Sequence, residues 1–239
     1  MEILIIALLT LASSAIGTIT GFGTSTIMVP ILVLFFPPVT AIFLVTIIHW
    51  FGDLWKVILF KKGFNLRLVV ILGISGVIAG YGGAALSLTI DPSILVRALG
   101  IFLVLYSFFL LLRPSFSIPA RPSVAVAGGV VSGFFAGMFG VGGAVRGAVL
   151  TAFNLPKEVY IATAGAIGIL VDSTRFITYV ASGVSLPERL AWGLFIFIPV
   201  SFIGAFAVKG VVNRIPQKRF RIVITLFLLV VGVKLVVWP

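Results

Sequence analysis

Residues 3–52 read ILIIALLTLASSAIGTITGFGTSTIMVPILVLFFPPVTAIFLVTIIHWFG and contain no Asp, Glu, Lys or Arg. A helix crosses the hydrocarbon core of a bilayer with about 20 mostly apolar residues. The stretch is long enough for more than one crossing, and a water-facing surface needs charges that it does not have. It therefore predicts helices embedded in a membrane.

The remainder of the chain continues this pattern. Further runs without charge cover residues 68–90, 98–112, 122–145, 190–208 and 222–233. Of the 239 residues, 61% are hydrophobic and only 10% are charged. We therefore predict an all-α, polytopic protein of the inner (cytoplasmic) membrane, with one transmembrane domain over residues 1–239. The net charge of +11 is spread between the apolar runs, which indicates membrane topology rather than nucleic-acid binding.

Apolar runs and helix breakers predict ten helical segments. They lie near residues 3–20, 24–36, 39–60, 66–90, 94–112, 122–141, 144–154, 158–182, 188–212 and 219–238. The connections between them are short, so any chemistry must lie within the membrane or at its rim. The chain has no cysteine, and we expect no metal site and no cofactor.

The two halves of the chain resemble each other, which indicates an internal duplication over about residues 3–113 and 122–239. A shift of 119 residues places Pro37 on Pro156 and Asp53 on Asp172. Matches between helix breakers and charged residues are more informative than matches between Leu and Val.

The distribution of basic residues favours inverted repeats. Four spans per repeat would divide the flanking Lys and Arg residues six against six, contrary to the positive-inside rule. If each Gly-rich segment is re-entrant and each repeat has three spans, the division becomes ten against three, and both termini lie outside. The ten are Lys61, Lys62, Arg67, Arg113, Arg121, Lys157, Arg214, Lys218, Arg219 and Arg221, and the three are Arg97, Arg189 and Lys234. Cysteine labelling at residues 63 and 117 tests this, since the two sites should be accessible from the same side.

Two Gly-rich segments, GTITGFGTST at 17–26 and GMFGVGGAVRG at 137–147, interrupt the apolar pattern. Freed backbone groups are tolerated at membrane depth only where they line a cavity or are buried in protein. Transporters use such breaks to direct helix N-termini at anionic substrates. The alternative is close helix packing through the pairs Gly17/Gly21, Gly76/Gly80 and Gly133/Gly137.

Charged residues within the spans are the other candidates. Arg146 follows the second Gly-rich segment directly and suits either an anion ligand or the partner of an acid such as Asp172. The pairs Asp53/Lys56 and Asp172/Arg175 have i,i+3 spacing, so each pair shares a helix face. They suit internal salt bridges, gate latches or a proton relay.

His49 is the only histidine, which rules out a His-based zinc site. It lies one turn before Asp53 and suits either proton coupling or a hydrogen-bonded interior position. The residues that we expect to bind an anion are Arg146, Gly21, Gly23, Thr24, Ser25, Gly140, Gly142, Gly143 and Thr163. The residues that we expect to act in gating or coupling are Asp53, Lys56, Asp172, Arg175 and His49.

Three segments carry a resemblance to a known family. They read GVGGAVRGAVLTAFNLPKEVYIAT at 140–163, VDSTRFITYV at 171–180 and GFGTSTIMVPIL at 21–32. Over essentially its whole length the chain resembles the TauE/SafE sulfite exporter (toluene-sulfonate uptake permease) family. The resemblance implies a secondary transporter for sulfite, sulfonates or other small oxyanions, without an ATPase domain.

Three alternatives stay open beside a carrier: an anion channel on the same scaffold, a membrane enzyme, and an accessory subunit without transport activity. One His, no Cys and no carboxylate cluster leave little for catalysis. Charges recurring within both repeats argue against an inert subunit. The expected partners are a small anion and the lipid bilayer; the cargo, direction, coupling ion and oligomeric state are left open.

Overall fold

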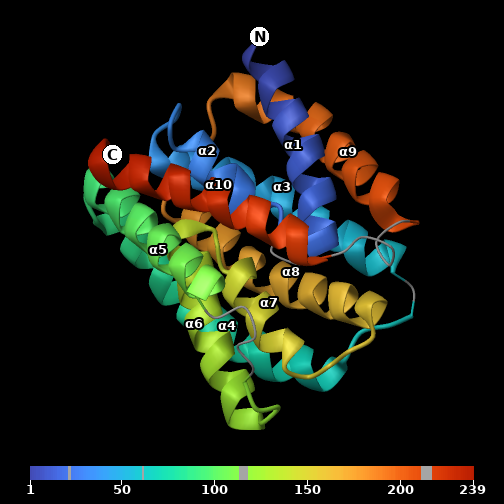
Figure 1. Cartoon of the computed structure of the whole chain (residues 1–239). Coiled ribbons are helices and arrows are strands. Elements are labelled where there is room, and N and C mark those ends of the chain that lie inside the picture. Colours follow the sequence, from blue (N-terminus) through green and yellow to red (C-terminus); the bar gives the residue numbers. More distant parts are fainter. Residues whose placement is uncertain (21–22, 61, 113–117, 211–216) are drawn as a thin grey trace.

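The structure is a computed structural model that describes residues 1–20, 23–60, 62–112, 118–210 and 217–239, with side chains of the last segment from residue 222 onward. Within these residues the chain forms ten α-helices and no strand, as predicted (Figure 1). In chain order they are α1 (Glu2–Thr20), α2 (Ser25–Leu32), α3 (Pro38–Leu59), α4 (Leu66–Thr89), α5 (Pro92–Leu112), α6 (Pro122–Phe139), α7 (Gly143–Thr151), α8 (Lys157–Ala181), α9 (Glu188–Lys209) and α10 (Gln217–Val237).

Helices long and apolar enough to cross a bilayer dominate the described part of the chain. There are seven of them, α1, α3, α4, α5, α6, α8 and α9, with lengths of 18 to 25 residues. The described apolar part of α10 is shorter, at Ile222–Val237. Large apolar side chains remain exposed along these helices, as expected where lipid replaces water. The prediction of a polytopic helical membrane protein is confirmed.

Prolines and short polar side chains set the start of several helices. Pro38, Pro92 and Pro122 each occupy the first helical position, where a missing N–H costs nothing. At the start of α5, Asp91 accepts hydrogen bonds from the backbone N–H and the hydroxyl of Ser93, at 2.8 and 2.6 Å. These bonds to Ser93 lower the pKa of the Asp91 carboxyl below its usual value.

Both predicted helix breaks are present. α2 has 8 residues and α7 has 9, which is about 12–14 Å at 1.5 Å per residue and too short to cross a bilayer. The helix that precedes each break is not short, however. α1 has 19 residues and α6 has 18, whereas a re-entrant segment would consist of two short helices.

Corresponding helices of the two halves pack against each other in opposite directions. His49 of α3 pairs with Asp172 of α8. One turn later on α3, Asp53 lies against Gly168, which is one turn earlier on α8, so the two helices are antiparallel. A second corresponding pair that is in contact, α5 and α10, is antiparallel as well. This arrangement supports inverted repeats, because repeats of the same orientation would place corresponding spans parallel.

The directions of the long helices show that the chain turns back in the segments that contain the short helices α2 and α7. Both α1 and α3 pack parallel to α9, and both α6 and α8 pack parallel to α4. The chain must therefore return after α1 before α3 begins, and after α6 before α8 begins. Figure 1 shows both termini and the α8–α9 connection toward the top and upper left, and the α7–α8 connection at the lower right. The sides of the membrane to which these two ends correspond stay a prediction, and residue 117, one of the labelling sites, lies outside the described residues.

Glycines hold α4 of the first half directly against α6 of the second. A Cβ atom on Gly133 would lie 2.2 Å from the carbonyl oxygen of Gly76. One on Gly137 would lie 2.1 Å from the carbonyl oxygen of Gly80. No real Cβ contact is that short, so the two backbones touch. The predicted packing role of these two pairs is confirmed.

Candidate functional site

Charged side chains are buried where α3 and α8 cross. Lys56 Nζ lies 2.7 Å from Asp53 Oδ1 on α3, and Arg175 Nη2 lies 2.8 Å from Asp172 Oδ1 on α8. All four residues are at most 4% exposed. Burying an unpaired charge is costly, so each pair needs its partner. The salt bridges predicted from the i,i+3 spacing are confirmed, one in each half of the chain.

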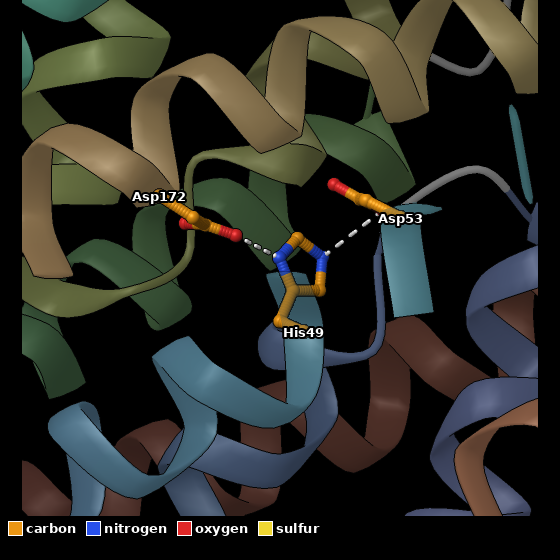
Figure 2. A group of neighbouring side chains, drawn as sticks. All are labelled: His49, Asp53 and Asp172. Atoms are coloured by element: carbon orange, nitrogen blue, oxygen red, sulfur yellow. Dashed lines mark hydrogen bonds and ion pairs between the residues drawn. The ribbon is translucent and has the colours of Figure 1, made fainter. Parts of the chain in front are cut away.

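His49 connects the two pairs, since it lies between their acids, Asp53 and Asp172 (Figure 2). Its Nδ1 atom lies 2.5 Å from Asp172 Oδ2, and its Nε2 atom lies 3.7 Å from Asp53 Oδ1. The ring is 2% exposed, yet Nε2 has no hydrogen-bond partner. His49 is therefore an interior histidine that is hydrogen-bonded at one nitrogen only.

Arg146 brings a third positive charge to the same place from α7. Its Nη2 atom lies 3.7 Å from Asp53 Oδ2, the side chain is 4% exposed, and its Nε has no hydrogen-bond partner. The acid that pairs with it is thus Asp53 and not Asp172, the acid suggested from the sequence. The difference arises from how α3, α7 and α8 pack in three dimensions, which sequence spacing does not reveal. We call the six residues His49, Asp53, Lys56, Arg146, Asp172 and Arg175 the charged cluster.

Both Gly-rich turns lie against the charged cluster. Gly23 has φ +82°, and a Cβ atom there would lie 2.7 Å from His49 Nε2. Gly140 has φ +75°, and a Cβ atom there would lie 3.1 Å from Arg175 Nη1. A side chain at either position would be strained by the backbone conformation and would strike a residue of the cluster. The glycines therefore let the two turns approach the charges closely.

The hydroxyl of Thr24 is a second unpaired group at this position. Thr24 is fully buried, its Oγ1 has no hydrogen-bond partner, and a Cβ atom on Gly52, between His49 and Asp53 on α3, would lie 3.6 Å from it. The next residue, Ser25, is buried at the start of α2. The first Gly-rich turn thus presents a hydroxyl as well as backbone to the cluster.

The other predicted ligands are placed less directly. Gly142 packs against α6, since a Cβ atom there would lie 2.1 Å from the carbonyl oxygen of Ser132. Gly143 is buried as the first residue of α7, and Gly21 lies outside the described residues. Thr163 lies on α8 two and a half turns before Asp172, about 13 Å at 1.5 Å per residue. Its hydroxyl bonds the Val159 carbonyl at 2.6 Å and the backbone N–H of Asn65 at 2.9 Å.

Gly168 belongs to the site and was not predicted. A Cβ atom on it would lie 1.6 Å from Asp53 Oδ2 and 3.1 Å from Arg146 Nη2. The internal repeat could have identified Gly168, because the shift of 119 residues places His49 on it. Where the first half has the imidazole ring, the second half has an open space that the Asp53 carboxylate occupies.

The charge balance of the cluster favours an anion. With His49 neutral, Lys56, Arg146 and Arg175 contribute three positive charges, against two negative charges from Asp53 and Asp172.

Within the described residues, ligand atoms of His49, Asp53 and Asp172 lie within 4.8 Å of one another, which is close enough for a metal ion. Each carboxylate is already paired with a cation, however, and Arg146 repels another, so the cluster is poorly suited to bind one.

Helix breaks that meet buried charges at a crossing of long apolar helices are typical of membrane transporters. The model of the family described as sulfite exporter TauE/SafE matches residues 5–235 of the chain. The chain therefore belongs to this family of membrane transporters, as its sequence motifs predicted. No curated protein was found to match it.

Proposed function

We propose that this protein is a secondary transporter that carries small anions, of the sulfite and sulfonate type, across the cytoplasmic membrane by alternating access. The observation that carries the proposal is the excess of one positive charge in the charged cluster, at a place where the two halves of the chain meet. A buried net charge is costly, and a bound monoanion would neutralise it. Membership of the sulfite exporter family supports an oxyanion of sulfur as the cargo.

Arg146 is the proposed principal ligand. Its nearest carboxylate oxygen is 3.7 Å away, beyond hydrogen-bond distance, and its Nε is unpaired, so the guanidinium has donors to offer. Arg146 is also in the first turn and a half of α7, whose N-terminal amides favour negative charge. A guanidinium matches the oxygens of a sulfonate group in the way it matches a carboxylate.

The two Gly-rich turns would complete the site. Gly23 and Gly140 bring the backbone of the turns close to the cluster, and Thr24 adds a hydroxyl that lacks a partner. Gly142 and Gly143, at the start of α7, belong to the same proposed set. Ser25 and Gly21 are adjacent and belong to the same proposed set. We leave Thr163 out of this set, because its hydroxyl is bonded to backbone groups.

The salt bridges suit a role in alternating access. Asp53/Lys56 and Asp172/Arg175 lie on helices that correspond under the repeat, and His49 joins them. Rocking of one half against the other would change the distance between these pairs. A bound anion that draws Arg146 away from Asp53 would favour that change, since differential contacts with the two states are what shift a conformational equilibrium.

The test is current measurement on solid-supported membranes with purified protein in liposomes, stepping through sulfite, sulfoacetate, thiosulfate, sulfate and acetate. We expect a saturable current for a sulfur oxyanion. In Arg146→Gln the half-saturating concentration should rise about 10- to 100-fold, because a charge-assisted hydrogen bond to the anion is lost. Arg146→Lys should lie between the two.

Arg97→Gln is the matched control, because Arg97 is an exposed arginine of α5 outside the cluster. Its current should equal that of the wild type. Equal currents in wild type and Arg146→Gln would contradict the proposed site. No current for any sulfur oxyanion from folded protein would contradict the cargo, and an accessory role would then be favoured.

A further inference from the structure

His49 Nε2 is one of four buried atoms of the charged cluster without a hydrogen-bond partner, the others being Asp53 Oδ2, Arg146 Nε and Arg175 Nε. The other ring nitrogen, Nδ1, is 2.5 Å from Asp172 Oδ2. An ionised carboxylate only accepts hydrogen bonds, so Nδ1 carries the proton of this bond. A neutral ring then leaves the lone pair of Nε2 bare, although the ring is only 2% exposed. A bare buried nitrogen costs stability, which a role in the transport cycle would explain.

A hydrogen-bond acceptor for a protonated Nε2 lies close by. Asp53 Oδ1 is 3.7 Å away, so a shift of less than 1 Å would convert a protonated Nε2 into a hydrogen-bond donor to this carboxylate. The other charged groups that face the ring are Lys56 on its own helix, Asp172 and Arg175 on α8, and Arg146 on α7. Two carboxylates and three cations therefore surround the ring, and a bound anion would screen the cations.

Charge arithmetic connects this proton to the cargo. With neutral His49 the cluster has a net charge of +1, which a monoanion neutralises. With protonated His49 the net charge is +2, which a dianion neutralises. Because an uncompensated buried charge is costly, the protonation state should follow the charge of the bound anion.

We propose that His49 is a coupling residue, a proposal that rests on the proposed function. His49 takes up one proton at Nε2 when a dianion such as sulfite binds, and none when a monovalent sulfonate binds. The proton adds to the lone pair of Nε2, and the resulting N–H donates to Asp53. Release of the anion restores the repulsion from Arg146, Lys56 and Arg175, and the proton leaves with its cargo. One proton and one dianion move together, so each cycle carries a net charge of −1.

The chain contains one histidine, so ¹⁵N-histidine labelling reports on His49 alone, provided that the purification tag contains no histidine. At about pH 8 an ordinary histidine is neutral and sulfite is mostly the dianion. Without anion we expect the NMR spectrum of a neutral ring with its proton on Nδ1. Sulfite should convert it to the doubly protonated ring, and methanesulfonate should leave it neutral.

The same anions are then applied to labelled Arg146→Gln, in which sulfite should no longer change the ring. In transport at about pH 8, His49→Gln should abolish the proton flux that accompanies sulfite, because glutamine cannot take up a proton at this position. A ring that stays neutral while sulfite produces a saturable wild-type current would overturn the coupling role and leave the proposed function intact. Conversion by both anions alike would overturn the charge matching.

If sulfite changes neither the ring nor the current, the proposed cargo fails, and a pH titration alone still decides the proton site. A ring that remains neutral down to about pH 5 would overturn it. Protonation of Nε2 in that range, with Nδ1 retaining its proton throughout, would support it.

Discussion

His49 and Gly168 occupy corresponding places in the two halves, and their difference makes the charged cluster asymmetric. The first half places an imidazole ring beside the opposite pair, and the second half provides the space that the Asp53 carboxylate fills. Arg146 breaks the symmetry in the same way, since the repeat places it on Ile27. An anion bound as we propose would therefore meet different side chains from the two halves.

Gly168→Ala tests this geometry. The new Cβ atom would lie 1.6 Å from Asp53 Oδ2, so the carboxylate must move from its place beside Arg146. We expect the half-saturating anion concentration to rise about 5- to 150-fold, because the small-to-large change costs about 1–3 kcal/mol at the site itself. The measurement is the current titration used for Arg146.

The control for Gly168→Ala is Gly82→Ala, in which the new Cβ atom has no neighbour within 4 Å. Its titration should match the wild type. A Gly168→Ala protein with wild-type affinity would show that the space beside Asp53 is not needed for binding.

Sequence spacing predicted the contents of the cluster better than its connections. The two i,i+3 salt bridges follow from helix geometry alone. The bond between His49 and Asp172 joins residues 123 positions apart, and it depends on how α3 and α8 cross. The same holds for the pairing of Arg146 with Asp53. Local periodicity contains no information on a crossing point, which is why Asp172 was named as the partner of Arg146.

At the scale of helices, α4 packs against α6 with one face and is exposed on the adjacent face. A Cβ atom on Gly83 would lie 2.3 Å from the carbonyl oxygen of Phe134 on α6, whereas Gly82 next to it faces open space. All ten predicted helices are present with ends within a few residues of those expected, because Pro, Gly and polar residues end the apolar runs. The largest deviation is α2, which ends at Leu32 rather than residue 36.

Adjacent glycines on α4 therefore offer a matched pair of substitutions. Gly83→Ala should lower the free energy of unfolding by about 1–3 kcal/mol, because the new methyl group forces α4 and α6 apart. Gly82→Ala should be neutral or stabilise by up to about 1 kcal/mol, since alanine favours helix and meets nothing. Thermal unfolding of the purified proteins in detergent measures both. Equal shifts for the two variants would contradict the close α4–α6 contact.

At the scale of the whole molecule, the distribution of charge predicted the membrane class. The duplication was predicted from helix breakers and charged residues that recur after 119 positions. The helix directions support the inverted arrangement, since α3 and α8 run antiparallel while α1 and α9 run parallel. The pairing of α4 with α6, by contrast, was not foreseen. Glycine spacing in each helix indicated a packing face, but nothing in either helix named the other as its partner.

The account as a whole requires a carrier whose cargo binds at the charged cluster. Counterflow of ³⁵S-sulfite into proteoliposomes preloaded with unlabelled sulfite tests this most directly. A carrier that alternates between two sides exchanges one anion for another, so the account predicts a transient accumulation of tracer that saturates with concentration and is lost in Arg146→Gln. Tracer entry that simply follows its gradient, without accumulation, would indicate a channel and contradict alternating access. Accumulation that persists unchanged in Arg146→Gln would remove the charged cluster from the binding site.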